Sequence, residues 1–130
     1  MSFHFGYWTV IDDNRHTVKS PAVAPEVTED EVPFALDNDT TLRIGGVLTF
    51  NADAVSPNNL TYSMDINDRP VIIDRPVDST VFHSEQEAIT QLPGRPLVLK
   101  HGENKLLIKI TGGTGTLRIS DIVLHHVRLS

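Results

Sequence analysis

The chain has 130 residues, 39% of them hydrophobic, and a formal net charge of −6 at pH 7. This length suits one domain over residues 1–130 that buries about two-thirds of the surface exposed by its unfolded chain, so its core needs no metal or disulfide. The acidity disfavours a nucleic-acid partner, because nucleic-acid binding relies on Lys and Arg that neutralise phosphates. The absence of cysteine excludes disulfides, thiolate metal sites and cysteine nucleophiles.

The beginning of the chain has no basic segment followed by an apolar one, so it does not resemble a cleaved signal peptide. No apolar run approaches the roughly 20 residues that a membrane-spanning helix requires. We therefore expect a soluble chain that does not insert into a membrane, and its cellular location is left open.

The first 33 residues predict one strand followed by an extended segment. Over residues 3–11 both alternating faces are mostly apolar, with Tyr7 on one face and Trp8 on the other, which predicts a strand covered on both sides. The Asp-Asp-Asn sequence at residues 12–14 ends this strand as a turn. Residues 19–33 contain three prolines and an acidic run, which disfavour helix and ladder alike, so we expect an extended crossover on the surface.

The middle of the chain contains two cleanly alternating segments. Residues 42–52 place apolar side chains at every second position, and residues 60–66 do the same after a Ser-Pro-Asn-Asn turn. Each pattern predicts a half-buried strand. The Asn-Asp-Arg-Pro segment that begins at Asn67 is typical of a tight turn, so residues 60–74 are expected to form a hairpin.

The last third of the chain begins irregularly and ends in regular strands. Within the irregular part, residues 80–82 suggest a strand and residues 84–92 a helical turn. Residues 102–127 predict a second hairpin that turns at Gly-Gly-Thr-Gly. The final strand changes its apolar phase at Ser120 and Asp121, and a β-bulge there would return both apolar sets to the core. Because no helix of three turns is predicted, the expected fold is an all-β antiparallel sandwich.

Three stretches of the sequence resemble elements of the galactose-binding-like jelly roll, the fold of many carbohydrate-binding modules. They are residues 60–71, with Ile-Asn-Asp-Arg-Pro-Val at the turn, residues 99–110, with Gly-Glu-Asn before an apolar strand, and residues 115–124, with an Asp before an aliphatic triplet. Asp68 stands where that family usually has glycine. The resemblance implies an antiparallel jelly-roll β-sandwich, while the ligand must be argued from the site, because one fold hosts many functions.

The same resemblance implies a structural calcium ion near the chain termini, with Asp121 at the position of the closing-strand ligand. Asp12, Asp13 and residues 37–39 would supply further oxygen atoms, because calcium takes about six to eight hard ligands. Aspartates in turns also cap their own backbone, and this is the role we favour. No other cofactor is expected.

A carbohydrate site needs flat rings that stack on a sugar and planar polar groups that bind its hydroxyls. The candidate ligand-binding residues are Trp8, Tyr62, Asn67, Arg69 and His83. Trp8 is the best candidate ring, because it is the only tryptophan and lies out of phase with the aromatic row of its strand. A core position competes with this role, since the chain has only eight Phe, Trp and Tyr residues.

Metal binding and catalysis have weaker support. His125 and His126 are adjacent on a predicted strand, so their side chains point to opposite faces and cannot bind one ion together. Asp65 and Asp74, expected near one rung of a hairpin, are the only local carboxylate pair of the kind a glycosidase uses. We therefore expect neither a metal centre of histidines nor an enzyme.

The sequence thus favours a non-catalytic, lectin-like binding module whose ligand is a carbohydrate. The alternative is a structural or assembly subunit of a virion, tail or surface complex, in which the apolar strand 3–11 packs against a partner or a second copy of the chain. The two functions differ in solution, because a lectin responds to glycans, whereas an assembly subunit forms concentration-dependent oligomers.

Overall fold

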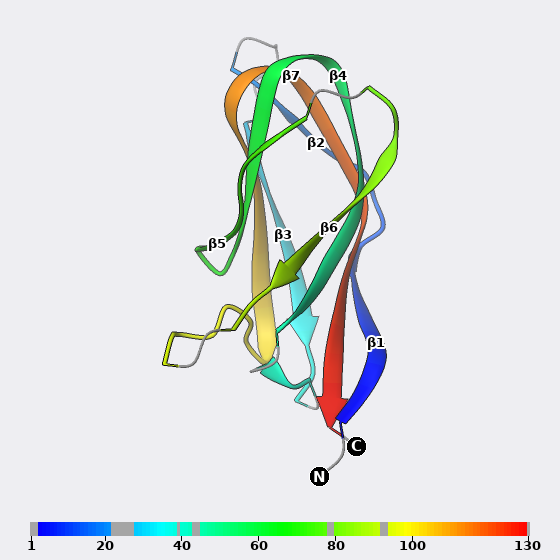
Figure 1. Cartoon of the computed structure of the whole chain (residues 1–130), viewed down its shortest axis with the longest axis vertical. Helices are drawn as coiled ribbons and strands as arrows, with labels where there is room; N and C mark the ends of the chain where they lie inside the picture. The colour runs from blue at the N-terminus through cyan, green and yellow to red at the C-terminus, as the bar shows by residue number, and fades with distance from the viewer. Residues whose placement is uncertain are drawn as a thin grey trace.

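The protein is described by a computed structural model that covers residues 3–21, 28–38, 40–42, 45–77, 80–91 and 94–129, without the side chains of residues 3–6 and 127–129. Seven strands follow one another along the chain (Figure 1): β1 (Phe3–Asp12), β2 (His16–Lys19), β3 (Glu29–Leu36), β4 (Gly46–Ile66), β5 (Arg69–Pro76), β6 (His83–Ile89) and β7 (Gly102–Leu129). All their pairings are antiparallel, and these residues include no α-helix, which confirms the predicted all-β class. The covered ranges likewise contain no helix of the length and apolarity that crossing a membrane demands.

The two longest strands, β4 and β7, organise the whole molecule. They pair along almost their full lengths, from Gly46 opposite His126 to Ile66 opposite Leu106, with register shifts near the middle. At that middle both strands curve over the top of the molecule in Figure 1. Gly113 makes the bend possible, because its φ of +71° favours glycine and a Cβ atom there would lie 2.1 Å from a backbone oxygen of β4.

The bend divides β4 and β7 between two layers that face each other. The first layer contains β6, the first half of β4, the second half of β7, and β1 with β2 at its far side. The second layer contains β5, the second half of β4, the first half of β7, and β3. The sandwich is therefore one sheet folded onto itself, and its edge strands are β1, β2 and β6 in the first layer and β3 and β5 in the second.

The predicted hairpin over residues 102–127 is wrong in its pairing. The two halves of β7 lie in different layers, and each half has β4 on one side and β1, β2 or β3 on the other. Both neighbouring positions of each half are thus occupied, so the halves do not pair with each other. The bulge is confirmed, because the register shifts where Thr49 and Asn51 pair with Val123 and Ser120, and Asp121 has a φ of +52°.

Three other sequence predictions are wrong. Residues 84–92 were expected to make a helical turn, but residues 83–89 form β6 because β4 offers them a free edge. The crossover expected over residues 19–33 contains part of β3, which tolerates Pro33 because β3 pairs on one side only. Residues 22–27 of that crossover lie outside the described part. The strand expected over residues 80–82 is absent, since β6 begins at His83.

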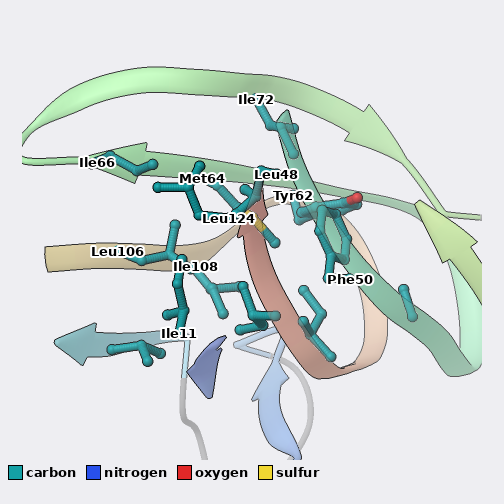
Figure 2. Packing of buried hydrophobic residues seen from close by; sticks show 14 of the residues in the cluster. Ile11, Leu48, Phe50, Tyr62, Met64, Ile66, Ile72, Leu106, Ile108 and Leu124 are labelled. Atoms are coloured by element: carbon teal, nitrogen blue, oxygen red, sulfur yellow. The ribbon is translucent and has the colours of Figure 1, made fainter. Parts of the chain in front are cut away.

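The hydrophobic core lies between the two layers (Figure 2). Alternating residues on both sides of the bend in β4 and β7 contribute to it, including Phe50, Tyr62 and Ile108. The rings of Phe50 and Tyr62 meet edge to face, with centroids 6.4 Å apart and an interplanar angle of 84°. The bulge at Asp121 is what lets Ile122 and Leu124 join Leu117 and Ile119 in this core.

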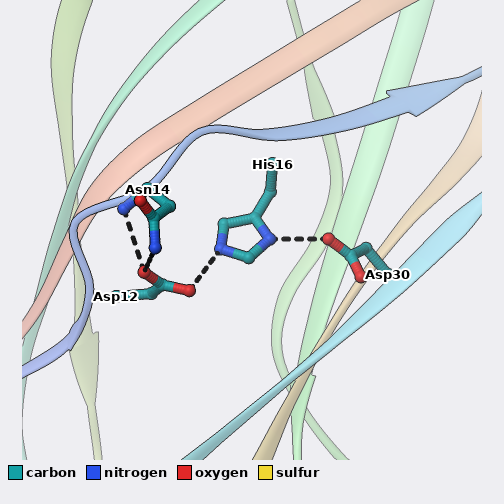
Figure 3. Close-up of polar contacts among 4 residues, drawn as sticks. All are labelled: Asp12, Asn14, His16 and Asp30. Atoms are coloured by element: carbon teal, nitrogen blue, oxygen red, sulfur yellow. Dashed lines mark hydrogen bonds and ion pairs between the residues drawn. The ribbon is translucent and has the colours of Figure 1, made fainter.

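Charged clusters connect the two layers along both open sides of the sandwich. On one side His16 of β2 lies between two carboxylates, with Nδ1 2.6 Å from Asp30 Oδ2 of β3 and Nε2 2.9 Å from Asp12 Oδ2 of β1 (Figure 3). On the other side Arg75 of β5 forms ion pairs with Glu85 and Glu87 of β6. These clusters connect edge strands of opposite layers where no backbone hydrogen bonds can do so.

Candidate functional site

Trp8 lies on the outer surface of the first layer. It is 64% exposed, and Val10 on the same face of β1 is 53% exposed, whereas Ile11 on the other face belongs to the core. The prediction that both faces of this strand are covered is therefore wrong, and so is a core position for Trp8. Trp8, Val10 and Val47 are thus all exposed apolar residues of the first layer, and an exposed apolar patch can mark a binding site.

Strand register identifies the side chains that share this surface with Trp8. One rung runs from Trp8 through His125 and Val47 to Ala88, and the next runs from Val10 through Val123 and Thr49 to Gln86. We call this surface the Trp8 face; it comprises Trp8, Val10, Val47, Thr49, Asn51, Ser84, Gln86, Ala88, Asp121, Val123 and His125. Its four strands, spaced about 4.8 Å apart, make a platform roughly 14 Å wide.

Polar side chains of the Trp8 face are held in place by one another. The Thr49 hydroxyl and His125 Nε2 lie 3.1 Å apart. Asn51 donates from Nδ2 to Asp121 Oδ2 at 2.9 Å and accepts at Oδ1 from the Ser84 hydroxyl at 3.1 Å. These bonds cross three strands, β6, β4 and β7, and fix the side chains flat against the sheet. Hydroxyl and carboxylate oxygens retain further lone pairs, so the row can still bind a ligand.

The bulge in β7 explains how Asp121 reaches this surface. Its φ of +52° places the residue outside the regular pleat, so its carboxylate meets Asn51 instead of pointing to the core. Asp121 is the one Asp, Glu, Lys or Arg residue of the Trp8 face. The Trp8 face is therefore almost uncharged in a chain whose net charge is −6.

Tyr62, one of the predicted ligand-binding rings, is fully buried. Its position in β4 is in phase with Leu60 and Met64, which also point into the core. Burial raises the pKa of the Tyr62 hydroxyl to about 12, against the opposing charge of Arg75. A ring enclosed in this way cannot stack on a sugar, so the prediction for Tyr62 is wrong, because alternation alone does not tell the inner face from the outer.

His83 lies near the start of β6, outside the Trp8 face. Its Nδ1 is 2.7 Å from the Val81 carbonyl oxygen and its Nε2 is 3.0 Å from Glu85 Oε1. The hydrogen bond to Val81, assisted by the Glu85 carboxylate, raises the pKa of His83 above 6.5. Its two ring nitrogens are thus engaged by the protein itself, and a sugar would have to displace one of these bonds.

Asn67 and Arg69 lie together at the β4–β5 turn. The Asn67 amide donates to the Val98 carbonyl and to Asn104 Oδ1, both at 2.8 Å, and its oxygen accepts from the Lys105 backbone at 3.0 Å. Asn67 therefore has a structural role that uses its whole amide group. Arg69 is exposed and borders a hollow that is separate from the Trp8 face.

The predicted calcium ligands are dispersed among other contacts. Asp12 Oδ1 accepts from the backbone and side chain of Asn14 at 2.9 and 3.0 Å, which is the turn-capping role that we favoured from the sequence. This capping, with the contact to His16, lowers the pKa of Asp12. In the described ranges no three His, Cys, Asp or Glu side chains cluster as they would around a metal ion, and Asp39 lies outside them. The calcium site remains a prediction.

The carboxylate pair proposed for catalysis is not formed. Asp65 pairs with Pro70 across the hairpin and binds Lys109 Nζ at 3.0 Å. Asp74 lies at a bulge, where its backbone nitrogen donates to the Ser63 hydroxyl, and its side chain is exposed. The expectation that the two carboxylates share a rung is wrong, because the register shifts between them.

Sequence reasoning missed most of the Trp8 face. The outward positions of Thr49 and Asn51 follow from alternation, but Gln86 and Ser84 lie in a segment that was predicted to be helical. What places them beside Trp8 is the order β6, β4, β7 and β1 in the first layer. The sequence does contain one indication of this strand. Ser84, Gln86 and Ala88 alternate with the charged residues Glu85 and Glu87, and such alternation is compatible with an edge strand.

No protein-family model matches the chain, and no curated protein matches it. Solved structures do match. Dimeric latent PorU from Porphyromonas gingivalis aligns with a TM-score of 0.55 and 12% identity, over 96% of this chain and 13% of PorU. The chain thus spans only a small part of that protein's length.

Two further matches cover nearly the whole of both chains. A family 35 carbohydrate binding module from an environmental isolate has a TM-score of 0.52 and 13% identity, over 100% of this chain and 98% of the module. A cyclase from Fischerella sp. TAU, in complex with 4-(1H-indol-3-yl)butan-2-one, has a TM-score of 0.52 and 12% identity, over 98% and 90%. At these identities the likeness shows the fold alone, a β-sandwich like that of carbohydrate-binding modules, as the resemblance to galactose-binding-like jelly rolls predicted.

Proposed function

We propose that the protein is a non-catalytic module that binds carbohydrate on the Trp8 face. The observation that carries this proposal is the exposed Trp8 ring on a flat sheet surface, beside an ordered row of polar side chains. The ring offers its face to the C–H groups of a sugar, and the Thr49, Asn51 and Gln86 side chains offer donors and acceptors to its hydroxyls.

The shape and charge of the Trp8 face favour an extended, uncharged glycan. A flat platform about 14 Å wide fits a chain of sugars better than a single sugar, which is usually enclosed by a pocket. The near absence of charge on this face removes both the attraction of an acidic glycan and the desolvation cost of buried ions. The fold shared with a family 35 carbohydrate binding module supports the proposal without identifying the ligand.

The test is binding of the full chain to a glycan array, followed by titration of the best glycan with Trp8 fluorescence as the signal. Replacing Trp8 by Ala should weaken binding about 10-fold or more, since covering a large exposed apolar side chain contributes roughly 1.5–3 kcal/mol. The melting temperature should stay nearly unchanged, because the ring is largely exposed. Ile73→Ala is the matched control, because Ile73 is a 70% exposed apolar residue of β5, in the other layer.

Absence of any glycan response, or equal affinity of the Trp8→Ala variant and the unchanged protein, would contradict the proposal.

The second candidate function is assembly, which is favoured by the apolar neighbours Val10 and Val47 on the same face. In that case the chain should form oligomers whose size depends on concentration and that dissociate in the Trp8→Ala variant. Light scattering after size-exclusion chromatography separates the two functions.

A further inference from the structure

A hollow of about 360 Å³ shares none of its lining residues with the Trp8 face. It is lined by Arg69 and Pro70 at the start of β5 and, after β6, by Thr90, Gln91, Arg95, Pro96 and Val98. The described residues that line it include two arginines and no Asp or Glu, although the chain has 17 acidic and 11 basic residues. The lining of this hollow is therefore cationic in a chain whose net charge is −6.

The charges of Arg69 and Arg95 are not neutralised by the protein. Within the described part of the chain, neither guanidinium forms an ion pair. By contrast, Arg75 and Arg118 are paired with carboxylates, Arg118 Nε donating to Asp53 Oδ1 at 3.1 Å. Two like charges at one hollow repel each other, and an anion bound between them would relieve that repulsion.

The walls of the hollow are fixed by hydrogen bonds at its base. Gln91 Oε1 accepts from the Val98 backbone at 2.8 Å, and the Val98 carbonyl accepts from the Asn67 amide at 2.8 Å. These two bonds hold Val98, which lines the hollow, to Gln91 and to Asn67. Backbone that is already ordered at one wall of a site loses less conformational entropy when a ligand binds.

We propose that this hollow is an oxyanion site, in which Arg69 and Arg95 bind a carboxylate or sulfate group. A guanidinium presents parallel N–H donors that match the two oxygens of either group. The Thr90 hydroxyl provides a further donor, and Pro70 and Val98 provide an apolar wall for the carbon skeleton that carries the anion. The volume lies near the lower end of the range for ligand pockets, about 300–1,000 Å³, so the occupant is a small organic anion or one charged sugar unit.

The experiment is calorimetric titration of the full chain with four probes: glucuronate, glucose 6-sulfate, inorganic sulfate and neutral glucose. The two charged sugars should bind, with the stronger one identifying the preferred oxyanion, and glucose should bind at least about 10-fold more weakly, because charge-assisted hydrogen bonds are the stronger ones. Raising the salt concentration from about 20 mM to about 200 mM should weaken binding, since these side chains are solvent-accessible.

The Arg69→Gln and Arg95→Gln variants should each weaken binding of the charged sugars about 10-fold or more. Arg15→Gln is the matched control, because Arg15 is an exposed arginine in the turn between β1 and β2, and it should change affinity less than about 2-fold. The Trp8→Ala variant should bind the charged sugars normally, which separates this site from the proposed glycan face. Equal binding of glucose and glucuronate, no binding of any oxyanion, or an equal loss in Arg15→Gln would overturn the proposal.

Discussion

Replacing Ile108 of β7 by Ala should strongly destabilise the protein. Ile108 is fully buried between the layers, and its cross-strand partners are Met64 of β4 and Asp30 of β3. The substitution removes three carbon atoms, at about 0.8 kcal/mol each, or about 2.4 kcal/mol of transfer free energy. The cavity adds a further cost, so the free energy of unfolding should fall by about 2.5–4.5 kcal/mol.

Chemical denaturation with urea measures this loss, provided that the slope of the transition is the same in both proteins. Lys109→Ala is the matched control, because Lys109 is the next residue, points outward and forms a partly exposed ion pair with Asp65. Its loss should stay below about 1 kcal/mol. A loss below about 1 kcal/mol for Ile108 with a larger one for Lys109 would refute the register, since a slip of one residue exchanges the two faces of a strand.

Two further predictions concern the bend and the pH dependence. Gly113→Ala should lower the free energy of unfolding by about 2 kcal/mol or more, because the new Cβ would lie 2.1 Å from a backbone oxygen. Gly102 has a similar φ but open space around it, so Gly102→Ala should cost only about 1 kcal/mol. Thermal denaturation compares the two variants, and equal losses would contradict the close contact at Gly113. The hydrogen bond to Val81 and the Glu85 carboxylate raise the pKa of His83 in the folded protein. The contribution of His83 to the free energy of unfolding is therefore complete below pH about 6.5 and is lost as the pH rises through the higher folded-state pKa. Unfolding free energies of the unchanged protein and His83→Gln should therefore converge toward high pH, and a constant difference across that range would argue against the assignment.

Part of the fold could be predicted from the sequence because strand alternation is local. The alternation of Leu106 and Ile108 can be recognised from its period of two, and both side chains are buried. The bulge at Asp121 was recognised as well, since a phase change in a strand with one buried face needs an extra residue. Both inferences use only neighbours in the sequence.

The pairing partners could not be predicted in the same way. The glycine-rich segment around Gly113 has the residues of a hairpin turn, but the strands on its two sides pair with β4 in different layers. Residues 83–89 have weak local preference, and the exposed edge of β4 makes them a strand. In both cases hydrogen bonds to a distant strand outweigh the local signal.

The candidate site depended most on the tertiary structure. Trp8 and Tyr62 are both aromatic residues of alternating strands, yet one is 64% exposed and the other is fully buried. Alternation separates the two faces of a strand but does not say which face meets the second layer. The assembly of the first layer decides that, and it also places Asn51 and Gln86 on the same surface as Trp8.

The sequence by itself thus determined the all-β class, the strands with one apolar face and the bulge that keeps β7 in phase, because these depend on period-two patterns within short segments. Only the tertiary structure decided that β4 and β7 fold over into two layers, that Trp8 faces solvent, and that Arg69 meets Arg95 at one hollow. These features depend on which strands become neighbours, and residues far apart in the chain compete for those places through hydrogen bonds and burial that no local pattern encodes.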